Sequence, residues 1–319
     1  KCLYVIANDK VFYVIDLISK EYAMRNLFDE KVLSISSCQS NNLIAFSFKD
    51  RVEIKAKIKG RLDNFCELYI EDSIVQWSSK GNFIAIGGKN KAPKSENYSF
   101  KMEYCLFFIN AYNYFTQDVL EFRYKIVKIK FIDNDNFLFV QTSDNSIFGF
   151  YVNVDNSSIS LIQMLEEQRN TAKNIKGSNL EQYNIGKRHF KDIFFYRLSL
   201  NQYTPILDFD YDSENEILIA VLEEKTILVQ KKGPSLYLPK EIKNTIYCCI
   251  KIIKELKCIL TGNREGYLKL YPWPPTVFTE DEPKKLGLSL NTIKLHEGEI
   301  TNLIVSPSNT LNSSVVPGV

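Results

Sequence analysis

Histidine, cysteine, glycine and carboxylate residues could support catalysis or ligand binding, and their spacing is the first test of each possibility. The sequence has two histidines. His189 lies in the polar stretch "GKRHF" and His296 lies far from it, and neither has Cys or carboxylate residues at metal-ligand spacing. The sequence contains no Gly-x-Ser-x-Gly or His-Glu-x-x-His motif. We therefore expect no catalytic, metal-binding or cofactor-binding residue, and no enzyme.

Two glycine-containing stretches invite comparison with a phosphate-binding loop. They read "TGNREGYLKLYPWPP", from Thr261 to Pro275, and "GNFIAIGGKNK", from Gly81 to Lys91. A Walker loop needs Gly-Lys followed by Ser or Thr at the start of a helix. In the second stretch Asn90 follows Lys89, and in the first the apolar alternation typical of a strand resumes at once. Both stretches therefore predict hairpin turns between strands.

The overall composition excludes several classes of protein. The chain has 319 residues, with 40 Lys and Arg against 38 Asp and Glu, so its charge gives no general attraction to nucleic acid or acidic lipid. Its apolar runs are shorter than a membrane span, and its seven cysteines lack Cys-x-x-Cys spacing. We expect a reducing compartment, no disulfides and no membrane segment. The start lacks an initiator Met and a signal-peptide pattern, so we expect a piece of a longer protein.

The elements that position these residues follow a repeat. Its first two strands, joined by a turn rich in Asn, Asp, Ser or Gly, recur five times: "KVLSISSCQSNNLIAFS", "SIVQWSSKGNFIAIGG", "IVKIKFIDNDNFLFVQ", "PILDFDYDSENEILIAV" and "TIYCCIKIIKELKCILTG". Period-two alternation favours strands over helices throughout. A third strand and a weaker fourth follow in most copies, which gives a period of roughly 40 residues, the value typical of a β-propeller blade.

The two ends and two polar insertions leave the number of blades open. Residues 1–29 supply the last three strands of a blade and residues 299–306 supply a first strand, so they either complete one blade together or belong to blades outside this chain. Five complete blades and a composite one make six. A seventh could lie in 165–204, which includes the strand-like "DIFFYRLSL". We expect an all-β fold, one propeller domain over 1–319 with six or seven four-stranded blades, seven if flanking residues are missing, and insertions at 89–101 and 165–190.

Candidate contacts with partners come from charged and aromatic residues near turns. In "EIKAKIKGR" the lysines alternate with apolar residues, which predicts a basic stripe of Lys55, Lys57 and Lys59 on one strand face. Such a stripe is either a solvated face or a contact for an acidic surface such as that of tubulin. Arg264, in a turn, and Trp273, at a strand exit, are further candidates for contact with proteins.

The stretch "HEGEITNLIVSPSN" resembles the start of a WD-repeat blade, with His296, Ser306 and Pro307 in the motif positions. "SIVQWSSKGNFIAIGG" resembles it as well, with Trp77. The resemblance implies a structural role for His296, inside a blade. The Trp-Asp pair of regular WD repeats is replaced by Ile15-Asp16 and, near the C-terminus, by Tyr271-Pro272.

More narrowly, "GNREGYLKLYPWP" followed by "HEGEITNLIVSPSN" resembles late blades of the axonemal WD-repeat proteins, the cilia- and flagella-associated proteins 57, 43 and 44. This resemblance implies a scaffold on doublet microtubules near dynein regulators, in the ciliary axoneme. The alternative is a WD-repeat scaffold in another large assembly, such as a vesicle coat, a ubiquitin-ligase adaptor or an RNA-processing complex. A phosphopeptide-binding module, with Arg264 as a contact, is a further alternative.

Overall fold

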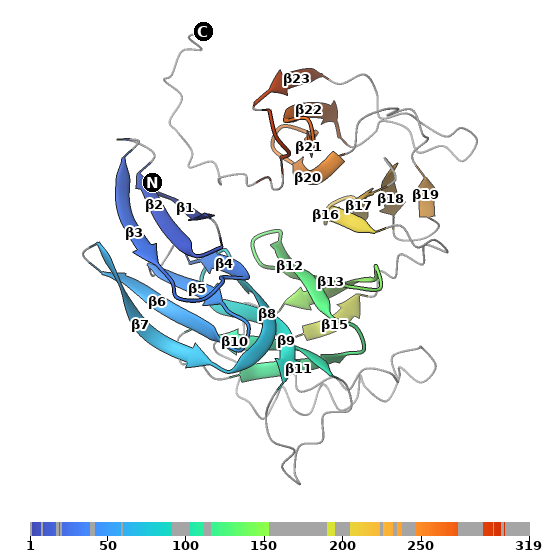
Figure 1. Ribbon diagram of the computed structural model, residues 1–319. Helices are drawn as coiled ribbons and strands as arrows, with labels where there is room; N and C mark the ends of the chain where they lie inside the picture. The colour runs from blue at the N-terminus through green and yellow to red at the C-terminus, as the bar shows by residue number, and fades with distance from the viewer. Residues whose placement is uncertain are drawn as a thin grey trace, which may run out of the picture. The chain divides into compact units, whose positions relative to one another are not determined.

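In the residues that it describes, the computed structural model consists of β-strands and their connections (Figure 1). It describes residues 2–7, 9–16, 19, 21–38, 42–58, 60–90, 103–111, 116–152, 190–194, 205–223, 226–231, 235–237, 247–273, 290–295, 297–300 and 303. Within these residues no helix is long and apolar enough to span a membrane. The chain divides into two compact units, Lys1–Ser199 and Leu200–Val319. The single domain expected over 1–319 stays a prediction.

The first unit holds one three-stranded and three four-stranded antiparallel sheets, each with its strands in chain order. The three-stranded sheet consists of β1 (Cys2–Ala7), β2 (Val11–Asp16) and β3 (Tyr22–Leu27). The others consist of β4 (Ser34–Ser37), β5 (Leu43–Ser47), β6 (Val52–Ile58) and β7 (Arg61–Leu68); β8 (Ile70–Trp77), β9 (Phe83–Asn90), β10 (Tyr104–Asn110) and β11 (Thr116–Phe122); and β12 (Ile126–Ile132), β13 (Phe137–Thr142), β14 (Ile147–Val152) and β15 (Phe190–Phe194).

The second unit holds two four-stranded antiparallel sheets with the same strand order. They consist of β16 (Ile206–Asp212), β17 (Ile217–Leu222), β18 (Thr226–Lys231) and β19 (Ser235–Tyr237); and β20 (Tyr247–Ile253), β21 (Cys258–Asn263), β22 (Tyr267–Pro272) and β23 (Asn291–Lys294). We call each four-stranded sheet a blade and number its strands first to fourth in chain order.

The described residues therefore form five complete blades and one three-stranded sheet, not six or seven complete blades. The range 165–204 that suggested a seventh blade contains β15, which pairs with β14 as the fourth strand of the preceding blade. That prediction was wrong because a strand's sequence does not say which neighbour it pairs with. Residues 153–189, which include most of the expected insertion, and residues 91–102 lie outside the described residues.

Most of the described strands form where the alternation predicted them, and the turns between them contain residues that tolerate the tight backbone conformations required. Asp133, Asn134 and Asp135, between β12 and β13, all have positive φ angles, which Asn and Asp tolerate better than other side chains. Gly266, between β21 and β22, has φ 80°. The second strand of each blade is buried on both faces, as in Leu43–Ser47, Phe137–Thr142 and Ile217–Leu222. Continuous apolar runs are typical of such strands.

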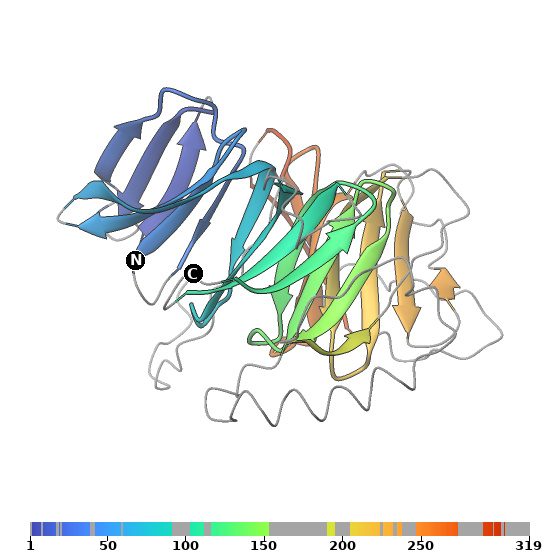
Figure 2. The same cartoon turned by 90° about the horizontal axis from the view of Figure 1, so that it is seen from below.

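Neighbouring sheets of the first unit pack face to face (Figure 2). Between the three-stranded sheet and the β4–β7 blade, the Phe12 ring meets the Phe46 ring edge-on, with 5.1 Å between centroids. Between the next two blades, a Cβ added at Gly87 would lie 2.7 Å from Ile126 Cγ2. This approach requires glycine at position 87 of β9, because a side chain there would overlap with Ile126.

Main-chain N–H groups of one blade also donate hydrogen bonds to side chains of the preceding blade. The hydroxyl oxygen of Ser34 on β4 accepts from the N–H of Val75 on β8 at 3.0 Å. Ser36 Oγ accepts from the N–H of Trp77 at 2.8 Å, and this second bond is fully buried. Serine at alternate positions of β4 therefore satisfies donors on the open side of β8 that would otherwise lack a partner.

The second unit repeats this arrangement with carboxylates. Asp208 Oδ2 and Asp210 Oδ2 on β16 accept from the N–H groups of Ile250 and Ile252 on β20, each at 2.9 Å. Both aspartates are buried, and Lys251 Nζ lies 3.1 Å from Asp210 Oδ2 as a counter-charge. Sequence patterns gave no sign of these side-chain bonds between blades, because each one links a side chain to the main chain of a distant segment.

Candidate interaction surfaces

The two glycine stretches have structural roles in the described residues. In the β21–β22 hairpin Asn263 Oδ1 accepts from the N–H groups of Glu265 and Tyr267, at 3.1 and 2.7 Å. These N–H groups are thus already paired within the turn. Gly87 and Gly88 lie inside β9. The prediction that the first stretch forms a hairpin is confirmed, whereas the turn expected after the second falls at residues outside the described part.

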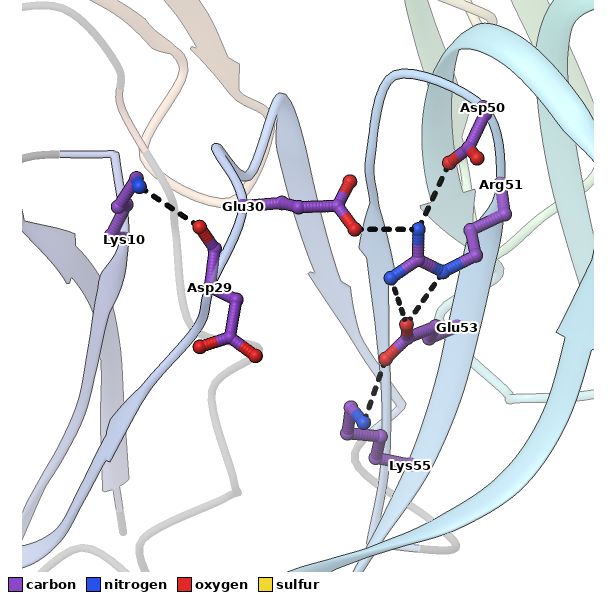
Figure 3. A network of polar contacts seen from close by, with 7 residues as sticks. All are labelled: Lys10, Asp29, Glu30, Asp50, Arg51, Glu53 and Lys55. Atoms are coloured by element: carbon purple, nitrogen blue, oxygen red, sulfur yellow. Dashed lines mark hydrogen bonds and ion pairs between the residues drawn. The ribbon is translucent and has the colours of Figure 1, made fainter.

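A network of ion pairs surrounds Arg51, in the turn between β5 and β6 (Figure 3). The Arg51 guanidinium lies 2.7 Å from Glu53, 3.0 Å from Glu30 and 2.9 Å from Asp50. Glu53 also lies 2.7 Å from Lys55 Nζ. Burial raises the pKa of Glu53, but hydrogen bonds from Lys55 and Arg51 outweigh it and hold that pKa below its usual value. Glu30 belongs to the β3–β4 connection, so the network fixes this connection to the β5–β6 turn.

The connection between β3 and β4 has further main-chain bonds to the β1–β2 turn. Phe28 N–H donates to the Lys10 carbonyl at 2.9 Å, and Val32 N–H donates to the Asp9 carbonyl at 2.7 Å. The Lys10 ammonium donates to the Asp29 carbonyl at 2.9 Å. The charged groups described in this part of the first unit therefore hold a chain connection in place.

The basic stripe expected on β6 is not an open cationic surface. The Lys55 side chain is 12% exposed and is paired with Glu53 and Asn64. Lys57 Nζ lies 5.8 Å from the centre of the Tyr4 ring. Lys59 lies outside the described residues. Alternation places Glu53 on the same strand face as the lysines, but it does not reveal the Tyr4 ring near Lys57, which comes from β1.

Trp273 is buried, so the exposure on which its predicted partner contact depended is wrong. Its side chain is 3% exposed, and its indole N–H donates to Asp212 Oδ2 at 2.8 Å. Asn215 donates to the same carboxylate oxygen at 2.7 Å. Burial raises the pKa of Asp212, but hydrogen bonds from Asn215 and Trp273 outweigh it and lower that pKa below its usual value. The Trp273 indole thus connects the end of β22 to the β16–β17 turn.

The remaining candidate residues lie apart from one another. Arg264 is exposed in the β21–β22 turn, with Glu223 at 3.9 Å. Trp77 lies in a core cluster that joins the β4–β7 and β8–β11 blades, and Asp16 ends β2 and accepts from the N–H of Ser19. His296, Ser306 and Pro307 lie outside the described residues, as does His189. The described residues bring none of these side chains together into one site.

The cysteines of the described residues are the next candidates for reactive or metal-binding groups. Burial raises the pKa of the Cys105 thiol to about 12, and burial together with Glu299 raises that of Cys248 to about 12. Thiols with such pKa values are protonated at neutral pH and are poor nucleophiles. Six described cysteines are free, and no group of three His, Cys, Asp or Glu side chains within the described part could hold a metal ion.

Twelve large apolar side chains are exposed in the described residues, and seven of them lie on the last strand of a sheet or next to it. These seven are Tyr22 and Leu27 with β3, Phe65 and Tyr69 with β7, and Leu290, Ile293 and Leu295 with β23, whereas Leu33, Ile58, Tyr124, Val127 and Leu256 lie elsewhere. Tyr69 is 70% exposed. Phe65 lies at the irregularity where the register of β6 and β7 shifts, which turns an otherwise paired side chain outward. The sequence predicted β3 and β7 as last strands, but alternation does not show which of their side chains stay exposed.

Comparisons with known proteins show the fold. No family model matches the sequence, and no curated protein matches it. The solved structures with a similar fold include the β-propeller domain of Cps50 (Swd1) from Myceliophteria thermophila, with a TM-score of 0.58 and 10% sequence identity. The match covers 83% of this chain and 76% of that one. The chain therefore has an all-β, WD-repeat-like propeller fold, as expected from the resemblance.

Proposed function

We propose that this chain is a non-catalytic scaffold that binds proteins through the outer edges of its blades. The observation that carries the proposal is the set of apolar side chains exposed on and beside β3, β7 and β23. Exposed apolar groups on last strands are costly unless a partner covers them, because such edges otherwise favour aggregation. The propeller fold is consistent with a scaffold, since propeller domains generally mediate contacts between proteins.

The absence of an enzyme activity is part of this proposal. It is supported by the use of charged groups in the described residues: Arg51 and Glu53 hold a turn, Asp208 and Asp210 join two strands, and Asp212 binds an indole. Each of these groups has its hydrogen-bonding capacity directed at the protein itself. A catalytic acid or base needs a position from which it reaches a substrate.

We further propose a place in the ciliary axoneme, with tubulin, dynein-regulatory or other axonemal proteins as partners. This part rests on the resemblance of residues 261–307 to axonemal WD-repeat proteins. The same fold would also serve a vesicle coat, a ubiquitin-ligase adaptor or an RNA-processing complex. The flanking sequence separates these assemblies, since a long heptad repeat favours the axoneme and an F-box or helical solenoid favours the alternative.

Cross-linking mass spectrometry of the tagged chain in isolated cilia tests the proposal. We expect cross-links to axonemal proteins, and Tyr69→Lys, alone or with Phe65→Lys, should reduce the cross-links formed by the first unit. Leu256→Lys is the matched control, because Leu256 is 67% exposed in the β20–β21 turn, away from any last strand. Absence from cilia together with recovery in another assembly would remove the axonemal part. Unchanged cross-links in both edge variants would contradict the binding edge.

A further inference from the structure

Three exposed residues alternate with two half-buried ones at the end of the last strand of the β4–β7 blade. Phe65, Glu67 and Tyr69 are exposed, and Tyr69 is the single residue between β7 and β8. Cys66 and Leu68, between them, pack on the core cluster that joins this blade to the β8–β11 blade. Because successive side chains of a strand point to opposite faces, the three exposed residues form one row on the other face, which we call the outer row.

The two ends of the outer row are aromatic. The Phe65 side chain is 54% exposed and the Tyr69 side chain is 70% exposed. A partner that covers two such rings removes a large apolar area from water, and aromatic side chains of this kind contribute strongly to protein interfaces. The rings can therefore supply binding energy, but they do not distinguish one apolar partner from another.

The residue between the two rings sets the charge of the partner. Glu67 on β7 pairs with Glu53 on β6, so two carboxylates lie opposite one another on neighbouring strands. Like charges in this arrangement destabilise a sheet. Among the described residues Glu53 has Arg51 and Lys55 as counter-charges, whereas no cation lies within ion-pair distance of Glu67.

The two cations of this network already have carboxylates of their own (Figure 3). The Arg51 guanidinium lies 3.0 Å from Glu30 and 2.9 Å from Asp50. Both Arg51 and Lys55 also lie 2.7 Å from Glu53. Two cations thus neutralise three carboxylates before the carboxylate of the outer row is added. A positively charged side chain is therefore the complement that the outer row requires between its two rings.

We propose that the outer row binds an extended segment of a partner protein in which a Lys or Arg side chain stands between two apolar side chains at alternate positions. The partner's cation pairs with Glu67 and offsets its repulsion from Glu53, while the two apolar side chains cover Phe65 and Tyr69. This partner chemistry rests on the proposed scaffold function. The required charge is opposite to that of the acidic surface that the lysines of β6 were expected to contact.

The synthetic peptides "TTLTRTLTT" and "TTLTETLTT" test the charge directly, because they differ only in the residue between the two leucines. Titration of the full chain, followed by the NMR shifts of its main-chain amides, should show roughly fivefold tighter binding of the arginine peptide. The shifts should be largest at the amides of Glu67 and Tyr69. Salt at about 1 M should remove the difference between the peptides, since it shortens the Debye length to about 3 Å.

The variant Glu67→Arg should reverse this preference, so that the glutamate peptide binds more tightly. It places a cation opposite Glu53, so its midpoint of urea unfolding should be no lower than that of the wild type. Glu255→Arg is the matched control, because Glu255 is an exposed carboxylate beside the exposed Leu256 in the β20–β21 turn. This control should keep the preference of the wild type.

Equal binding of the two peptides, or a preference that Glu67→Arg leaves unchanged, would overturn the proposal. Protection of Tyr69 from hydroxyl-radical oxidation in the free chain would do so as well, because another part of the chain would then cover the outer row. A dimer that Glu67→Arg dissociates would assign the row to a second copy instead of a partner protein. In isolated cilia, cross-links that depend on Tyr69 but not on Glu67 would refute the charge of the partner and leave the scaffold function intact, whereas cross-links that depend on neither would contradict the binding edge itself.

Discussion

Replacing Ser36 with alanine tests the side-chain bonds between blades directly. The Ser36 hydroxyl accepts from the N–H of Trp77 at 2.8 Å in a fully buried position. Alanine removes the acceptor and leaves a buried N–H without a partner, which costs about 1–2 kcal/mol of the free energy of unfolding. For a unit of this size the midpoint of thermal unfolding should fall by about 3–6 °C.

The readout is native-state hydrogen exchange of the Trp77 amide together with urea unfolding. We expect the amide to exchange roughly 5- to 30-fold faster in Ser36→Ala than in the wild type. Ser37→Ala is the matched control, since Ser37 is the next residue of the same strand and is half-buried, and its stability should change by less than about 0.5 kcal/mol. An unchanged exchange rate at Trp77, or equal losses in the two variants, would refute the reasoning.

Two further changes test the second unit. Trp273→Phe removes the indole hydrogen bond to Asp212 and should lower the free energy of unfolding at pH 7 by about 1–2 kcal/mol. Because the pKa of Asp212 in the folded protein lies below its usual 3.8, this contribution is present above about pH 4 and is lost as the pH falls through the folded pKa. Urea unfolding from pH 7 to pH 3 should therefore show the stabilities of the two proteins converging, and a constant difference would contradict the role of the carboxylate. Gly262→Ala places a Cβ 2.6 Å from Ile300 Cγ2 and 2.7 Å from Cys249 Sγ, and it should lower the free energy of unfolding by about 1–3 kcal/mol. Adding Ile300→Ala to the same chain should restore part of that free energy, because it removes the atoms that the new Cβ meets. Strictly additive losses of the two changes in urea unfolding would argue against this contact.

Much of the fold follows from local sequence, and the failures have a common physical cause. Alternation and turn residues locate β4, β5, β12 and β13, because hydrophobic periodicity is a property of each strand by itself. The pairing of β15 with β14 could not be predicted, since it depends on a neighbour that lies far away in the sequence. β23 was missed for a related reason, because its four residues are exposed and polar enough to resemble a loop.

The candidate contacts were harder to predict than the strands. Trp273 follows a strand and precedes prolines, which suggested an exposed position, but its side chain is buried and its indole N–H donates to Asp212. Lys55 lies on the expected strand face, where it pairs with Glu53, two residues earlier on that face, and with Asn64 of the neighbouring strand. Sequence spacing places Glu53 there, but it does not place Asn64 or Asp212.

Ser34, Ser36, Asp208 and Asp210 each accept a hydrogen bond from a main-chain N–H group of the next blade. A main-chain donor is the same whatever side chain the residue carries. Each of these joints therefore constrains the residue type on one side only, and the blade on the other side is free to change its sequence as long as its strand keeps its register. Successive blades can diverge in this way until no shared motif remains, while the order of strands and their joints persists.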